Sequence, residues 1–117
     1  MIIPASQFFQ LLSDETRLRC LMLMQQEGEL CVCELTHALG LIQPKISRHL
    51  ATLRDAGVVS DRRQGQWIYY RIHPDLPAWA CDVIESTVTE VAGSSPFCDD
   101  LVALKDMPNR PSAACCA

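Results

Sequence analysis

The feature that most constrains this fold is a pair of amphipathic helical patterns with a very short connection. Apolar residues recur at helical spacing in residues 33–39 and again in residues 43–56, and only Gly40, Leu41 and Ile42 separate the two patterns. Two helices that are joined by a glycine-containing turn of three or four residues form a helix-turn-helix. The sequence therefore predicts this motif in the middle of the chain.

The flanking patterns predict three further helices and a β-hairpin. The expected helices span residues 6–12, 14–27, with Ser13 as N-cap, and 78–92, and the hairpin strands span 58–63 and 67–72. We therefore expect a mainly α winged helix-turn-helix, with helices before and after the hairpin, in one domain of residues 1–93. Prolines and small residues predict a flexible, Cys-containing tail over 94–117, with at most a turn or two of helix in 99–106.

Charge is distributed unevenly along the chain. The 117 residues carry a net charge of −4, yet residues 42–72 hold six basic and two acidic side chains. A basic segment in an acidic protein creates a local field that attracts phosphate.

No apolar run approaches the roughly 18 residues of a membrane span. The chain has seven cysteines and no signal-peptide core, which indicates metal or thiol chemistry in a reducing compartment. We expect a cytoplasmic protein that does not bind membranes.

The second helix of the motif has the side chains of a DNA-reading helix. Ile46, Leu50 and Leu53 form its apolar stripe, and Arg48 points about 170° away from them. Small, hydrogen-bonding and basic side chains near a helix N-terminus suit the major groove, while a basic hairpin suits flanking phosphates. We expect His49, on the border of the stripe, to pack and not to read bases. The predicted DNA contacts are Gln43, Lys45, Ser47, Arg48, Thr52, Arg62, Arg63, Tyr69 and Arg71.

The first and last predicted helices have apolar faces that find no partner within the predicted core. They either cover the core of a monomer or join two copies, and the extent of their apolar surface favours a homodimer. A two-fold dimer reads a near-palindromic site in double-stranded DNA. The predicted dimerisation residues are Phe8, Phe9, Leu12, Val83, Ile84, Val88 and Val91.

Cys31 and Cys33 stand at the predicted start of the helix-turn-helix. Soft, thiophilic ions select thiolate ligands. Positions i and i+2 point about 200° apart in a helix and about 180° apart in a strand, so only a bent segment brings both sulfurs to one ion. If the pair begins the helix, chelation distorts its first turn. The ion and the DNA then favour different conformations of that segment, so that each weakens binding of the other. The alternatives are two small buried apolar residues, or a redox switch that forms a disulfide or persulfide.

The other cysteines leave the ligand count open. Cys98, Cys115 and Cys116 are candidates for a third thiolate or a second site, and an incidental role in the tail is an equal alternative. We expect Cys20 in the core and Cys81 at an interface or the surface. A thiol enzyme is disfavoured because the chain has no phosphate-cradling loop and no placed general base.

Four motifs carry a resemblance to a known family: SDETRL (13–18), ELCVCEL (29–35), QPKISRHL (43–50) and QGQWIYYR (64–71). In order and spacing they resemble the ArsR/SmtB winged-helix repressors, in particular the arsenic-responsive branch, over residues 6–92. The resemblance implies a homodimer that represses a resistance operon and leaves its operator when a metal or metalloid binds. The implied effector is As(III), with Sb(III) as a second candidate, and no organic cofactor is expected.

Three departures from the family pattern have consequences. Ile42 replaces the usual serine N-cap of the reading helix, which costs about 1 kcal/mol of local stability. Thr36 stands where arsenic-sensing relatives often have a third cysteine. Residues 78–92 contain no histidine, so the zinc site that other branches build there is disfavoured.

Overall fold

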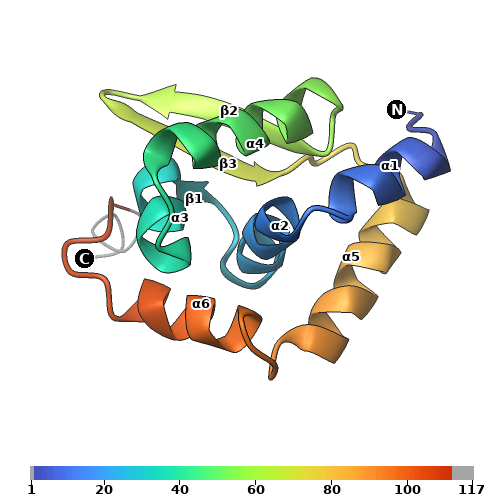
Figure 1. The fold of residues 1–117 in the computed structure, drawn as a ribbon. Coiled ribbons are helices and arrows are strands. Elements are labelled where there is room, and N and C mark those ends of the chain that lie inside the picture. The colour runs from blue at the N-terminus through green and yellow to red at the C-terminus, as the bar shows by residue number, and fades with distance from the viewer. Residues whose placement is uncertain (1, 112–117) are drawn as a thin grey trace.

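The computed structural model describes residues 2–111 of the chain. Figure 1 shows α2 at the centre, α1 and α5 on one side, α3 on the other, α6 beneath, and α4 with the hairpin above. None of the described helices is long and apolar enough to cross a membrane. The elements are α1 (Ala5–Leu12), α2 (Glu15–Glu27), β1 (Leu30–Cys31), α3 (Val32–Leu39), α4 (Gln43–Asp55), β2 (Val59–Gln64), β3 (Trp67–Ile72), α5 (Ala78–Val91) and α6 (Phe97–Lys105).

The predicted helix-turn-helix is confirmed. Gly40 ends α3 in the left-handed conformation, with φ at 67°, which glycine adopts without strain. The predicted stripe of α4, Ile46, Leu50 and Leu53, is fully buried. Ile42 is the N-cap of α4, and its side chain makes no capping bond, as the sequence predicts.

The start of α2 differs from the prediction by one residue. Asp14, and not Ser13, is the N-cap, because its carboxylate accepts a hydrogen bond from the Arg17 backbone N–H at 3.2 Å. Ser13 instead donates its hydroxyl to the Gln10 carbonyl at 2.7 Å. The serine therefore closes α1, and the aspartate opens α2.

The sheet contains a strand that sequence reasoning missed. The hairpin of β2 and β3 is confirmed, and β1 pairs with β3 on its other side, which gives an antiparallel sheet in the order β1-β3-β2. Cys31 lies opposite Tyr69 in this register. A two-residue strand is too short to show an alternating pattern. The pairing joins the segment of the cysteines directly to the hairpin.

α6 lies where the sequence predicts at most a turn or two of helix, in 99–106, and the flexible tail expected from residue 94 is wrong for this segment. This helix packs against α2 and α3, and Leu104 is fully buried. Asp100 is also buried, and its carboxylate accepts two bonds from Arg19 of α2, at 2.6 and 2.8 Å. Apolar burial and a compensated charge therefore order a segment whose prolines predicted irregular chain, and the domain extends beyond residue 93.

The faces proposed for dimerisation are partly used within the protomer. Phe8, Leu12 and Ile84 are buried in its core, and so they are unavailable as exposed contacts. Phe9 is 51% exposed, and Trp79 of α5, which the prediction omitted, is 39% exposed. Their rings lie 6.4 Å apart. The exposed part of the α1–α5 face is therefore aromatic. The predicted aliphatic residues Val83, Val88 and Val91 pack, partly buried, against the core.

Candidate DNA-binding face and thiol site

The N-terminal half of α4 presents polar and basic side chains to solvent. Gln43 and Arg48 are exposed, and Lys45 and Ser47 are half-buried on the same part of the helix. Within residues 2–111, no carboxylate forms an ion pair with Lys45 or Arg48. Exposed Thr52 donates its hydroxyl to the Arg48 carbonyl at 3.1 Å. These residues keep the arrangement that the sequence predicts for a helix in the major groove.

The basic residues of the hairpin fall into two groups. Arg63 and Arg71 are exposed, as a phosphate-contacting wing requires. Arg62 instead holds Glu29, with Nε 2.8 Å from Oε2 and Nη2 2.5 Å from Oε1. Its guanidinium carbon also lies 4.6 Å from the centre of the Tyr69 ring.

Tyr69 is only 4% exposed. The sequence placed it on an open face of the hairpin, but the ring is covered, with the Arg62 guanidinium carbon 4.6 Å from its centre. It supports Arg62 and does not itself face solvent. The Arg62–Glu29 pair joins the wing to the residue before β1, across 33 positions of sequence.

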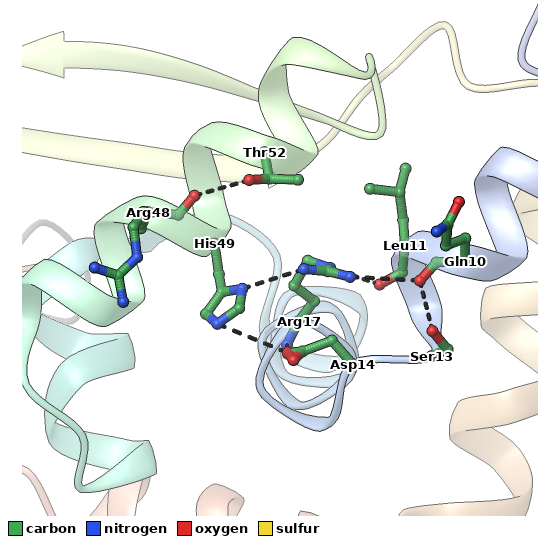
Figure 2. Close-up of polar contacts among 8 residues, drawn as sticks. All are labelled: Gln10, Leu11, Ser13, Asp14, Arg17, Arg48, His49 and Thr52. Atoms are coloured by element: carbon green, nitrogen blue, oxygen red, sulfur yellow. Dashed lines mark hydrogen bonds and ion pairs between the residues drawn. The ribbon is translucent and has the colours of Figure 1, made fainter.

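A polar network fixes α4 to the first two helices (Figure 2). Arg17 of α2 donates through Nε to the Leu11 carbonyl at 2.7 Å, and its Nη1 lies 3.3 Å from Nδ1 of His49. Because a guanidinium only donates, Nδ1 is the acceptor in this contact. Nε2 of the same ring lies 3.8 Å from the Asp14 carboxylate. Burial lowers the pKa of His49 below its usual value of 6.5. The expectation that His49 packs and does not read bases agrees with these contacts.

Cys31 and Cys33 stand where a strand becomes a helix. Cys31 ends β1 and has the extended N-cap conformation of α3, with φ −75° and ψ 151°, and Cys33 follows in the first turn. The Cys33 thiol donates to the Cys31 sulfur at 3.1 Å. The segment is bent, as the sequence argument requires for two sulfurs to share an ion.

The first helical turn is intact although the two sulfurs lie this close. Two sulfurs bound at about 2.3 Å, with a right angle between the bonds, lie about 3.3 Å apart. The observed 3.1 Å is already close to this separation. The junction between β1 and α3 therefore brings the two thiols close to the separation of a two-thiol clamp.

Burial and neighbouring charge set the properties of the clamp. Cys31 is 2% exposed and Cys33 is half-buried. Burial, followed by the hydrogen bond with Cys31, raises the pKa of Cys33 to about 12. Ion binding at Cys33 therefore displaces a thiol proton at neutral pH.

A buried carboxylate connects the clamp to the C-terminal segment. Glu34 is fully buried, and its Oε1 accepts the Cys31 backbone N–H at 2.8 Å. Its Oε2 accepts Nε of Arg110, also at 2.8 Å. Arg110 additionally lies 3.7 Å from Glu27. The chain after α6 is therefore fastened beside the start of α3.

The clamp opens into a cavity of about 500 Å³ between α3, the start of α4 and the hairpin. Thr36 lies one turn after Cys33, and its hydroxyl is buried without a hydrogen-bond partner in the described structure. The lining residues are Cys31, Val32, Cys33, Thr36, His37, Gln43, Gln66, Trp67 and Ile68.

The remaining cysteines separate into structural and peripheral positions. Cys20 is fully buried, as predicted, and burial raises its pKa to about 12. Cys81 is half-buried against the Leu76 carbonyl, and Cys98 lies beside Asp99. Within residues 2–111 no three His, Cys, Asp or Glu side chains form a metal-binding group. Cys115 and Cys116 lie outside the described residues.

Comparison with known proteins gives consistent matches. Residues 14–61 match the family described as bacterial regulatory protein, arsR family. The chain is 52% identical over 110 residues to the arsenic resistance transcriptional regulator ArsR1 of Pseudomonas putida, covering 93% of this chain and 84% of that protein. It is 54% identical over 79 residues to the arsenical resistance operon repressor of Escherichia coli, covering 68% of each.

Among solved structures, the AntR antimony-specific transcriptional repressor superposes with a TM-score of 0.62 at 27% identity, over 76% of this chain and 83% of that one. The structural similarity and the sequence relatives therefore agree on the fold.

Proposed function

Because this chain belongs to the arsR family of bacterial regulatory proteins, we propose that it is a DNA-binding transcriptional repressor of an arsenic-resistance operon, which leaves its operator when As(III) binds Cys31 and Cys33. The observation that carries this function is the position of the clamp: two sulfurs 3.1 Å apart, at the first residues of the helix-turn-helix and on a strand paired with the hairpin. Sb(III) has the same preference for sulfur and is a second effector.

DNA recognition in this account uses two elements. The exposed N-terminal half of α4, with Gln43, Lys45, Ser47 and Arg48, enters the major groove. Arg63 and Arg71 of the hairpin contact the flanking phosphates. The chain acts as a homodimer through the aromatic α1–α5 face of Phe9 and Trp79, and the operator is therefore near-palindromic.

Release follows from how the clamp is connected to the wing. Cys31 is paired with Tyr69 across β1 and β3, and Glu29, just before β1, holds Arg62. A change in the backbone at Cys31 therefore reaches the hairpin through two independent contacts. The ion and the operator favour different arrangements of this unit, and a coupling free energy of about 1–3 kcal/mol suffices for release.

The third bond of inorganic As(III) needs a ligand beyond the clamp. Arg110 is held at Glu34, which itself contacts the Cys31 backbone. Cys115 and Cys116 follow Arg110 in the sequence and lie outside the described residues. In this proposal, Cys115 or Cys116 of either subunit supplies the third thiolate. The double variant Cys115→Ser/Cys116→Ser is expected to weaken the arsenite response and leave DNA binding unchanged.

Thiol-redox switching is not favoured, because the relatives above are named for arsenic resistance. The test is release of a fluorescent operator duplex, followed by anisotropy in a phosphine reductant that keeps thiols reduced. Arsenite is expected to release the wild-type protein under these conditions. Cys33→Ser should bind DNA normally and fail to respond, whereas the control Cys81→Ser should behave as wild type. Release of Cys33→Ser by arsenite would refute the clamp.

A further inference from the structure

Arg17 stands between three helices (Figure 2). Its Nε donates to the Leu11 carbonyl at 2.7 Å, and its Nη2 lies 3.4 Å from the Gln10 carbonyl, so the guanidinium holds the C-terminal end of α1. Its Nη1 donates at 3.3 Å to Nδ1 of His49 in α4. The last carbonyls of a helix have no intrahelical partner and favour a cation. One side chain of α2 therefore joins the end of α1 to the reading helix.

The His49 ring is held from two sides. Its side chain is 18% exposed, and Nε2 lies 3.8 Å from the carboxylate of Asp14, the N-cap of α2. Because Nδ1 accepts from the guanidinium, the proton of the neutral ring is on Nε2, on the side of this carboxylate. Successive residues of a helix point about 100° apart, so a fixed ring also fixes the direction of exposed Arg48 beside it.

The proposed homodimer makes this link important for DNA geometry. α1 carries exposed Phe9 of the α1–α5 dimer face, whereas α4 carries the DNA contacts. The separation of the two reading helices in a two-fold dimer therefore depends on the angle between each α4 and its own α1. Such a dimer reads half-sites about one turn of DNA apart, so a tilt of α4 changes the half-site spacing that the dimer fits.

We propose that Arg17 and His49 are positioning residues for DNA recognition, which hold α4 at the angle to α1 that matches the spacing of the operator half-sites. The inference rests on the proposed repressor function and on the homodimer. Neither side chain contacts a base in this arrangement. Without the link, each α4 keeps Gln43 and Arg48 for its own half-site, but the two reading helices no longer hold one separation.

The experiment compares three labelled duplexes by anisotropy with the full chain. The first is the operator that the wild-type protein selects from a random-sequence library, the second has one base pair inserted between the half-sites, and the third contains a single half-site. Arg17→Met and His49→Leu should each lower operator affinity about 10-fold, reduce the penalty of the inserted base pair, and change half-site affinity less than about twofold. His49→Asn keeps an acceptor two bonds from Cβ, as Nδ1 is, and should recover most of the operator affinity.

Three results would overturn the inference while leaving the repressor intact. The first is an equal loss of operator and half-site affinity in Arg17→Met and His49→Leu, which would mean that the link only supports folding. The second is an unchanged penalty for the inserted base pair, or no recovery in His49→Asn. The third is a variant that sediments as a monomer at the assay concentration, because the residue would then act on assembly.

Failure of the proposed function gives a different result. The wild-type protein would then select no DNA sequence from the library, or arsenite would not release it from the selected duplex. Selection of a two-half-site operator by the wild-type protein, with its affinity lowered in the two variants and half-site affinity retained, supports the positioning role.

Discussion

Removal of the Arg110 guanidinium tests the link between the C-terminal segment and the start of α3. The Arg110 side chain is 14% exposed, and it donates at 2.8 Å to Glu34, which is fully buried. Arg110→Ala therefore removes the guanidinium that donates to this buried carboxylate, and breaking a buried ion pair typically costs 3–5 kcal/mol. Glu34 keeps the backbone N–H of Cys31, so we expect a loss near the lower limit, about 3 kcal/mol.

Lys105→Ala is the matched control. Lys105 pairs with Glu27 at 3.6 Å, but its side chain is 59% exposed, and an exposed pair contributes little to the free energy of unfolding. Urea unfolding at a fixed protein concentration measures both variants, because dimerisation makes apparent stability concentration-dependent. In a double-mutant cycle, Glu34→Gln should recover part of the loss caused by Arg110→Ala. An Arg110→Ala change no larger than that of Lys105→Ala would refute the buried link.

Three further predictions follow from the DNA-binding face and the core. Arg48→Ala should reduce discrimination between operator and unrelated DNA, whereas Arg63→Ala should weaken binding to both DNAs about equally and reduce the salt dependence of binding. DNA titrations at several salt concentrations measure both variants, and the opposite result would mean that Arg63 reads bases and Arg48 contacts phosphates. The folded state lowers the pKa of His49 below 6.5, so its neutral ring contributes fully to the free energy of unfolding above pH 6.5, and this contribution is lost as the pH falls below that value. In urea unfolding between pH 7 and 5, the free energy of unfolding of His49→Gln should decrease less than that of the wild-type protein. Leu104→Ala should destabilise the protein by about 2–5 kcal/mol, since Leu104 is fully buried, and a negligible change would mean that α6 is not part of the core.

The reading helix could be predicted from sequence because its signal is local. The spacing of Ile46, Leu50 and Leu53 defines one apolar stripe, and the glycine after α3 marks the turn, so the motif follows from periodicity alone. The hairpin has a comparable local pattern. The strand β1 has two residues and no periodicity, so its pairing with β3 could not be predicted.

The geometry of the thiol clamp depends on that missing strand. Ideal helix and strand angles separate the sulfurs of Cys31 and Cys33, whereas the junction between the two element types brings them together. The contacts of Arg62 with Glu29 and of Arg110 with Glu34 join residues 33 and 76 positions apart. Such pairings are determined by tertiary packing, and a single sequence contains no local signal for them.

The residues of α6 show the opposite error. The prolines and small residues around the helix predicted irregular chain with at most a turn or two of helix in 99–106, although Phe97, Leu101 and Leu104 recur at helical spacing. The pattern is short, and the helix is stabilised by its packing against α2 and α3. Composition averaged over a tail therefore hides a helix that tertiary contacts stabilise.

The affinity of the clamp for arsenite, measured once with the free protein and once with the protein saturated by operator DNA, tests the central claim most directly. Because coupling between two ligands is reciprocal, DNA must weaken arsenite binding by the same factor by which arsenite weakens DNA binding, about 5- to 150-fold. We predict equal factors in this range from the two titrations. Arsenite binding of equal strength with and without DNA would contradict the account.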